Sequence, residues 1–267
     1  MNELGTGGIR KMLSHVGDEV NYTLPIGDGS LPMNPLIGQT VRLEYLGEIR
    51  CVSCGRKTKK SFSQGHCFPC MRKLASCDGC IVRPETCHYA AGTCREPEWG
   101  ETHCLIPHTV YLSNTGGTKV GITRGGNEMI RWVDQGASQA LPIFTVPERL
   151  ISGQVETQLK AHISDKTNWR KMLSGEPEMV DLHQLRDALL ENVSALGYTP
   201  RSDAETVTIR YPVQQYPEKV KSLDIEKLGT IEGKLWGIKG QYLIFDVGVI
   251  NVRKYTGYTW RVQSTTS

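Results

Sequence analysis

The segment CVSCGRKTKKSFSQGHCFPC, residues 51–70, is the most informative stretch of this sequence. It contains Cys51-x2-Cys54, then twelve residues, then Cys67-x2-Cys70. Each CxxC pair can supply two thiolates to one tetrahedral ion, and the chain between the pairs is long enough to turn back and complete the shell. The spacing therefore predicts a closed zinc ribbon that stabilises folding, and not a redox site.

All nine cysteines lie between Cys51 and Cys104. A dense cluster in a chain without an export signal favours metal over a disulfide framework, and an odd total argues against complete pairing. The second part of the cluster holds five thiols and two imidazoles, more than one tetrahedral site needs; they are Cys77, Cys80, Cys87, Cys94, Cys104, His88 and His103. We expect a second zinc site on Cys77, Cys80, Cys87 and Cys94. An iron–sulfur cluster on the same thiols is the alternative, and the sequence does not separate the two.

Composition excludes several classes of protein. The chain has 267 residues, of which 39% are apolar, enough for a buried core, and its formal net charge is only +3. A nucleic-acid partner would therefore be held by a local basic patch. No window approaches the roughly 18 consecutive apolar residues of a membrane helix, and the N-terminus MNELGTGGIRK lacks a signal peptide's apolar region. We expect a cytoplasmic protein with no membrane contact. No P-loop or dinucleotide fingerprint is present in the sequence, so a nucleotide cofactor is not expected.

Patterning along the chain predicts an α+β fold in five segments. Residues 1–50 alternate apolar runs with turns and predict an N-terminal β segment, and residues 51–105 form the zinc-binding segment. Residues 106–175 predict a small α/β module, and 176–200 a linking helix. Residues 201–267 are β-rich with glycine at most junctions, which predicts a small barrel or sandwich that the N-terminal strands can complete.

Within the α/β module, residues 108–114 and 118–123 predict two short strands joined by Thr115-Gly116-Gly117, with helices near 128–137 and 153–163. The linking helix is predicted from apolar residues at three- and four-residue spacing before Gly197; they are Met179, Leu182, Leu185, Leu189, Val193 and Leu196.

Val110-Tyr111 and the run from Lys119 to Thr123 (KVGIT), followed by Arg131 and Glu156, resemble the motifs of the GIY-YIG nuclease module. This stretch is most similar to the branch of that family in which the second motif has the sequence KIG-x-T. The resemblance covers about 65 of the 267 residues. It implies a hairpin of a tyrosine strand and a glycine strand, an arginine on the first helix and a glutamate that binds one divalent metal. The whole layout also resembles an uncharacterised bacterial cysteine-rich family.

The resemblance implies catalytic roles for Tyr111, Lys119, Arg131 and Glu156. Glu156 would bind Mg²⁺ or Mn²⁺ through hard oxygen, and Arg131 would clamp a phosphate with its planar fork. Tyr111 would orient or deprotonate water, which requires a pKa below its usual value of about 10. The sequence has Thr118 or Lys119 where the family has its second tyrosine; Lys119 would be the base if buried, or a phosphate contact.

Each of these residues also has a structural interpretation. Tyr111 can be a core aromatic residue, Arg131 can pack on Trp132, and Glu156 can form a helical salt bridge with Lys160. The two CxxC pairs are called knuckles below. The cations between them either contact phosphates or form a solvated charge run; they are Arg56, Lys57, Lys59 and Lys60.

Three functions follow from these observations. The first is a metal-dependent endonuclease that uses the four catalytic candidates. The second is a DNA- or RNA-binding protein that does not cut, held to phosphates by Arg124 and the cations near the first knuckle. The third is a zinc-stabilised interaction protein that contacts a protein partner through aromatic residues of the β tail, namely Trp236, Tyr242, Tyr255, Tyr258 and Trp260.

Overall fold

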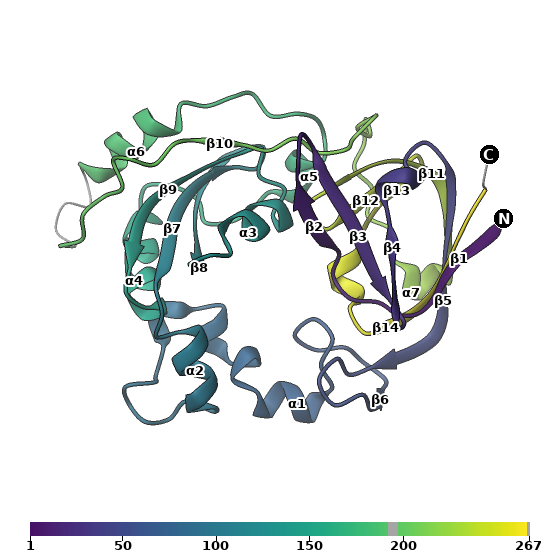
Figure 1. Cartoon of the computed structure of the whole chain (residues 1–267), viewed down its shortest axis with the longest axis horizontal. Coiled ribbons are helices and arrows are strands. Elements are labelled where there is room, and N and C mark those ends of the chain that lie inside the picture. Colours follow the sequence, from purple (N-terminus) through teal and green to yellow (C-terminus); the bar gives the residue numbers. More distant parts are fainter. Residues whose placement is uncertain (192–196, 266–267) are drawn as a thin grey trace. The chain divides into compact units, whose positions relative to one another are not determined.

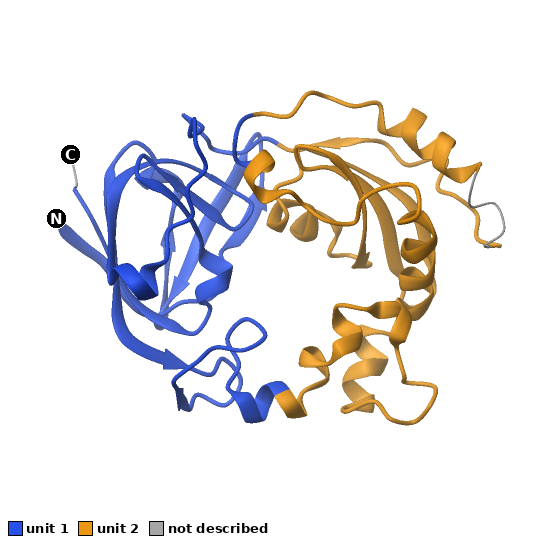
Figure 2. Cartoon of the chain, turned by 180° about the vertical axis from the view of Figure 1, so that it is seen from behind, with its two compact units in different colours: residues 1–71, 173–175, 210–267 blue, residues 72–172, 176–209 orange. Residues whose placement is uncertain are grey.

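The computed structural model describes residues 1–191 and 197–265. They divide into two compact units (Figure 2). Unit 1 comprises residues 1–71, 173–175 and 210–267, and unit 2 comprises 72–172 and 176–209. Helices and several antiparallel sheets make this a mixed α+β fold, as predicted. Within the described residues, no helix has the length and apolar content needed to cross a membrane.

Unit 1 is built on a seven-stranded antiparallel sheet (Figure 1). Its order is β1 (Asn2–Gly8), β14 (Tyr258–Ser264), β5 (Thr40–Arg50), β11 (Thr230–Lys239), β12 (Tyr242–Phe245) and β13 (Gly248–Asn251), with β6 (Lys57–Thr58) paired to β5. A second sheet contains β2 (Leu13–Val16), β3 (Val20–Ile26) and β4 (Gly29–Pro32). Short helices are η1 (Asn34–Leu36), α7 (Ile225–Leu228) and η6 (Val252–Tyr255). Because β14 lies between β1 and β5, the first and last parts of the chain share one sheet.

The prediction of a closed C-terminal barrel is wrong for the described residues. The two ends of the large sheet, β1 and β13, do not pair with each other. The outer edge of β13 is occupied instead, because Val249 exchanges backbone hydrogen bonds of 2.8 Å with Lys221 and Leu223. An edge whose backbone groups are already satisfied cannot accept another strand.

Three of the aromatic residues proposed as partner anchors belong to the core of unit 1. Trp260, Tyr255 and Tyr258 are buried. The centre of the Tyr255 ring lies within 6 Å of the centres of both the Tyr258 and the Trp260 rings. Trp236 and Tyr242 are only partly buried. The tail therefore uses most of its aromatic surface for packing.

Unit 2 contains a four-stranded antiparallel sheet in the order β10 (Val207–Thr208), β9 (Gln139–Val146), β7 (His108–Asn114) and β8 (Thr118–Arg124). The helices are α3 (Glu128–Asp134), α4 (Arg149–Leu159), α5 (Trp169–Met172) and α6 (Leu182–Leu190). Strands β7 and β8 and helix α3 lie where the sequence predicted them, whereas α4 begins and ends four residues before the predicted 153–163. One sheet face is apolar: Val110, Leu112, Val120 and Ile122 pack with Val155 and Leu159 of α4. The alternate residues point to the other face, as the two-residue period of a strand requires.

The linking helix is shorter than predicted. Helix α6 begins at Leu182 because the Asp181 carboxylate accepts hydrogen bonds from the backbone N–H groups of His183 and Gln184, which caps it. Met179 lies before the helix and is exposed, whereas Leu182 and Leu189 are buried. The predicted positions Val193 and Leu196 lie outside the described residues.

The remainder of the cysteine segment has no strand among the described residues 72–107. After α1 (Phe68–Lys73) it consists of the short turns η2 (Ala75–Cys77), η3 (Gly79–Ile81) and η4 (Pro84–Thr86), followed by α2 (Pro97–His103). Helix α4 packs closely on η4 at Gly153, where a Cβ atom would collide with the backbone of Glu85. This close approach places the start of α4 beside the cysteine turns.

Candidate functional site

The four cysteines of the two knuckles form one cluster in unit 1. The thiols of Cys51, Cys54, Cys67 and Cys70 all lie within 4.8 Å of one another. The Cys54 and Cys67 sulfurs are 3.8 Å apart, which is about the edge of a tetrahedron with Zn–S bonds of about 2.3 Å. Cys51 and Cys67 are buried, and Gly55 turns the first knuckle with a φ of 71°. The donor set and its geometry fit a zinc ion, and they agree with the prediction from the sequence.

The cations beside this cluster are exposed, but most have protein partners. Arg56 hydrogen-bonds to the Cys54 thiol, which raises the pKa of Arg56. The Lys57 ammonium lies 2.8 Å from a Glu48 carboxylate oxygen, and the Lys60 ammonium lies 5.6 Å from the centre of the Phe62 ring. Lys59 is exposed. The loop is therefore a solvated basic surface in which three of the four cations contact other groups of the protein.

In unit 2, Tyr111 of β7 and Lys119 of β8 lie on the polar face of the sheet, and the third candidate, Arg131, lies on α3. The Tyr111 hydroxyl donates a hydrogen bond of 3.0 Å to the Gln135 side-chain oxygen, and the Lys119 ammonium donates one of 2.7 Å to the same oxygen. Both side chains are buried, with 0% and 2% exposure. Gly121 makes room for the phenol, because a Cβ there would lie 2.7 Å from the Tyr111 hydroxyl. The Arg131 guanidinium also faces Tyr111 and acts on its pKa.

Glu156 is the fourth candidate and lies at the edge of this group on α4. Its charge acts on the pKa values of Tyr111 and Lys119, although α4 packs on the apolar face of the sheet. It is 9% exposed, and one carboxylate oxygen lies 3.4 Å from the Lys160 ammonium. Lys160 also pairs with Asp165 at 3.1 Å. The structure thus brings the four candidates together, and it also forms the Glu156–Lys160 salt bridge.

Burial decides the protonation of this group. It raises the pKa of Tyr111, so the residue is a neutral phenol that donates a hydrogen bond and is not a base at neutral pH. It lowers the pKa of Lys119 to about 8, and the nearby Arg131 charge adds to the shift. Burial also raises the pKa of Glu156, although Lys160 opposes the effect. Lys119 is therefore the member of the group closest to exchanging a proton at physiological pH.

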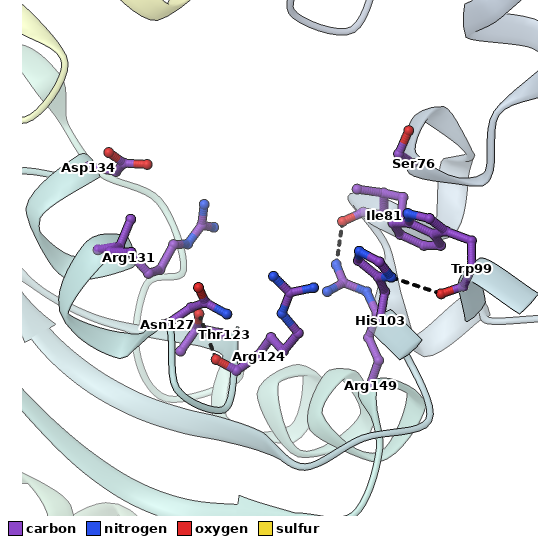
Figure 3. Close-up of a pocket in the computed structure, with 11 residues that line it drawn as sticks. Ser76, Ile81, Trp99, His103, Thr123, Arg124, Asn127, Arg131, Asp134 and Arg149 are labelled. Atoms are coloured by element: carbon purple, nitrogen blue, oxygen red, sulfur yellow. Dashed lines mark hydrogen bonds between the residues drawn. The ribbon is translucent and has the colours of Figure 1, made fainter. Parts of the chain in front are cut away.

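An open cavity of about 270 Å³ lies next to this buried group (Figure 3). Three arginines line it: Arg124 from the end of β8, Arg131 from α3 and Arg149 from the start of α4. Asp134 is the only acidic residue in the lining, so the walls carry an excess of positive charge. Figure 3 shows the guanidinium groups of Arg124 and Arg131 pointing into the space.

The opposite wall of the cavity comes from the cysteine segment. Arg149 donates a hydrogen bond of 2.6 Å to the Ile81 carbonyl, which ties α4 to this wall. Trp99 and His103 stack there with ring centres 4.2 Å apart. Two buried guanidinium donors, the Nε atoms of Arg131 and Arg149, have no hydrogen-bond partner in the described structure. A buried donor without a partner is costly, so an anion that supplies oxygens would be stabilised here.

The site does not fit the divalent metal that the GIY-YIG resemblance implies. Mg²⁺ and Mn²⁺ need several oxygen ligands. Glu156 does not line the cavity, and one of its oxygens is paired with Lys160. The nearest further carboxylate, Asp165, is held by the same lysine. The residues present are arranged for an anion.

The second cysteine group lies in unit 2. Cys80, Cys87, Cys94 and Cys104 line one small hollow, together with His88. Cys77, which the sequence grouped with the first three of these, does not line it. Cys104 is buried there.

Sequence reasoning missed several of these residues. Gln135 was overlooked because an uncharged residue at the end of a helix gives no chemical signal. Arg149 was overlooked because nothing in the sequence relates the start of α4 to the end of β8. Trp99 and His103 offered one signal, an aromatic and an imidazole four residues apart on a helical segment, which places them on one face.

The fold and the four-cysteine cluster define an α+β protein with a zinc-type tetrathiolate site. The chain belongs to the protein family of unknown function DUF2797, which matches residues 38–260. No curated protein and no solved structure matches it.

Proposed function

We propose that this protein binds nucleic acid, and that the arginine-lined cavity of unit 2 holds the phosphate groups. The observation that carries the proposal is the convergence of Arg124, Arg131 and Arg149 on one open cavity whose lining contains a single acidic residue. A guanidinium fork matches two phosphate oxygens, and the unpartnered Nε donors of Arg131 and Arg149 are of the type that such oxygens satisfy.

The aromatic wall of the cavity favours a nucleic acid over a small inorganic anion. Trp99 is partly exposed and stacks on His103, so the cavity combines a π surface with cations. Proteins that bind single strands use this combination, because bases stack on aromatic rings while the backbone follows the positive charge. The exposed cations near the first knuckle add a second basic surface, on unit 1.

The experiment is a binding titration with labelled DNA and RNA, single- and double-stranded, at increasing salt. Arg149→Gln and Arg131→Gln remove cavity charges, and Arg10→Gln removes an exposed arginine of unit 1 as the matched control. A charged hydrogen bond contributes about 1.5–3 kcal/mol, so each cavity variant is expected to weaken binding by about tenfold or more. The slope of log affinity against log salt should fall by about 0.7–0.9 for each lost phosphate contact. Equal losses in the cavity variants and in Arg10→Gln would refute the proposal.

A second candidate function is phosphodiester cleavage by a GIY-YIG-like module. One observation favours it: Arg131 lines the cavity and also faces the buried group of Tyr111, Lys119 and Glu156. The lowered pKa of Lys119 suits proton transfer near neutral pH. Because Glu156 is paired with Lys160, a divalent metal would have to be held mainly by the substrate; incubation of plasmid and structured RNA with and without Mg²⁺ or Mn²⁺ tests the function. If the wild type cuts the substrate and both Arg131→Ala and Glu156→Ala abolish the cutting, the result supports an enzyme. Salt-sensitive binding without cutting supports the nucleic-acid-binding function instead.

A further inference from the structure

Three side chains of different chemistry meet in the cysteine segment of unit 2. A carboxylate oxygen of Asp78, the thiol sulfur of Cys80 and a ring nitrogen of His88 all lie within 4.8 Å of one another. Asp78 caps the turn η3, Cys80 lies within that turn, and His88 follows η4, so two successive turns supply the three atoms. Sulfur, nitrogen and oxygen are all ligands that zinc accepts in proteins.

The hydrogen bonds of His88 direct one ring nitrogen toward the other two groups. The Thr93 hydroxyl donates a hydrogen bond of 3.3 Å to the His88 carbonyl oxygen, so its own oxygen can accept one. The Nδ1 atom of His88 lies 2.8 Å from that oxygen, which makes Nδ1–H the donor of the neutral ring. The Nε2 atom then carries a lone pair. A histidine that ligates a metal has this arrangement, with its second ring nitrogen bonded to a neighbouring group.

The distance between His88 and Asp78 suits a shared metal better than a hydrogen bond. Nε2 of His88 lies 3.4 Å from Oδ2 of Asp78. Hydrogen bonds from nitrogen to oxygen are usually about 2.7–3.2 Å long. Nitrogen and oxygen ligands at about 2.0–2.2 Å from a tetrahedral zinc ion lie about 3.4 Å apart. A bridging proton would serve only two of the three groups, whereas a metal ion also binds the Cys80 sulfur.

The other contacts of the Asp78 carboxylate leave room for a metal. The Arg95 guanidinium lies 2.8 Å from Oδ2, and the Gly79 backbone N–H donates a hydrogen bond of 2.6 Å to Oδ1. A carboxylate has about four lone-pair positions, so these two contacts do not exhaust it. Carboxylates that ligate metals commonly have such hydrogen bonds, which orient them. Glu156, in contrast, belongs to no comparable group of ligand atoms in the described residues.

The three side chains line an open cavity of about 470 Å³. The rest of its lining is Gly79, Val82, Arg83 and Thr86, none of which is a usual zinc ligand. Cys87 precedes His88 but lies outside the group of atoms within 4.8 Å. A zinc ion here would therefore have its fourth position toward the cavity and would bind water there. Three protein ligands and one open position are typical of catalytic zinc sites, whereas structural sites are closed.

We propose that Asp78, Cys80 and His88 bind a zinc ion whose fourth position is open to this cavity. The ion ties η3 to the end of η4 in a segment with few buried aliphatic side chains, since Val82 is 80% and Leu105 38% exposed. A segment of this kind usually needs a metal or covalent link to fold. The inference does not depend on what the arginine cavity binds.

The test is zinc analysis of the full chain, combined with X-ray absorption at the zinc edge. We expect about two zinc ions per chain, with an average of about 2.5 sulfur and 1.5 nitrogen or oxygen ligands per ion, because one site has four thiolates and the other has one. His88→Gln should lose one zinc and leave the other with sulfur ligands only. Arg95→Gln removes the ion pair with Asp78 but no ligand, so it is the matched control and should keep both ions.

Four results would overturn the proposal. The first is a single zinc ion per wild-type chain. The second is an average of sulfur ligands only, which would assign the second ion to cysteines alone. The others are two zinc ions retained by His88→Gln, and a zinc ion lost from Arg95→Gln as readily as from His88→Gln. If His88→Gln does not fold, the zinc content and the ligand average of the wild-type chain still decide the question.

Discussion

Replacement of the buried Lys119 by methionine should stabilise unit 2 at neutral pH, and the gain should shrink as the pH rises. Lys119 is 2% exposed, and burial lowers its pKa from 10.5 to about 8. In the folded protein the ammonium is therefore held in surroundings that disfavour its charge. Methionine keeps the length of the side chain and removes that charge, while the Tyr111 hydroxyl continues to bond to Gln135.

The magnitude follows from the two pKa values. The difference of about 2.5 between them corresponds to about 3 kcal/mol, since one pKa unit is 1.36 kcal/mol. The folded pKa lies below the unfolded one, so the unfolded chain binds the extra proton between about pH 8 and 10.5. Stability of the wild type therefore rises with pH across this window, and the penalty is fully present below it. Between pH 7 and 9.5 the advantage of Lys119→Met should fall by about 2 kcal/mol.

Urea unfolding followed by tryptophan fluorescence at pH 7 and pH 9.5 measures this change. Loss of the hydrogen bond to Gln135 adds a constant offset that does not depend on pH, so the difference between the two pH values isolates the ammonium. Lys227→Met, at an exposed position of unit 1, is the matched control. Its effect on the free energy of unfolding should be the same at pH 7 and pH 9.5. If Lys119→Met also changes the free energy of unfolding by the same amount at both pH values, the placement of Lys119 as a buried cation is refuted.

Three further predictions concern single contacts. Removal of zinc with a chelator, or Cys54→Ser, should release the zinc ion of the first cluster and make residues 51–70 sensitive to protease, whereas an unchanged digest would contradict a structural role. Gly121→Ala should destabilise unit 2 by about 1–3 kcal/mol in urea unfolding, because the new Cβ meets the Tyr111 ring, and a neutral effect would argue against this packing. Asn114→Ala should cost about 1–3 kcal/mol, because it removes bonds of 3.1 Å to the Gln139 side chain and 2.8 Å to the Glu178 carbonyl; unfolding midpoints equal to the wild type would exclude this role.

Local patterns predicted β7, β8 and α3 of unit 2, because each is specified by neighbours in sequence, but strand β9 was not predicted. Strands β7 and β8 alternate, and α3 ends at Asp134, two residues before Gly136, whose φ of 69° suits a helix stop. The prediction of a barrel in unit 1 failed for a non-local reason. Whether a sheet closes depends on what covers its last strand, and the segment around Lys221 that covers β13 has no strand pattern of its own.

The first metal cluster was predictable because its chemistry is contained within twenty residues of sequence. The second zinc site predicted on Cys77, Cys80, Cys87 and Cys94 stays a prediction; Cys80, Cys87, Cys94 and Cys104 line one hollow, which Cys77 does not. The arginine cavity shows the limit of local patterns. Arg131 was named from a motif and Arg124 as a phosphate contact, but a motif states only which residues occur in order. Arg149 joins them because Gly153 lets α4 lie against η4, a contact between segments 68 residues apart that no local pattern encodes. The shape of the cavity therefore depends on the cysteine segment staying folded, so a change in that segment has to be separated from loss of a cationic side chain. Arg124→Gln makes that separation, because it removes a cavity charge, whereas Arg149→Gln would also break the hydrogen bond to the Ile81 carbonyl.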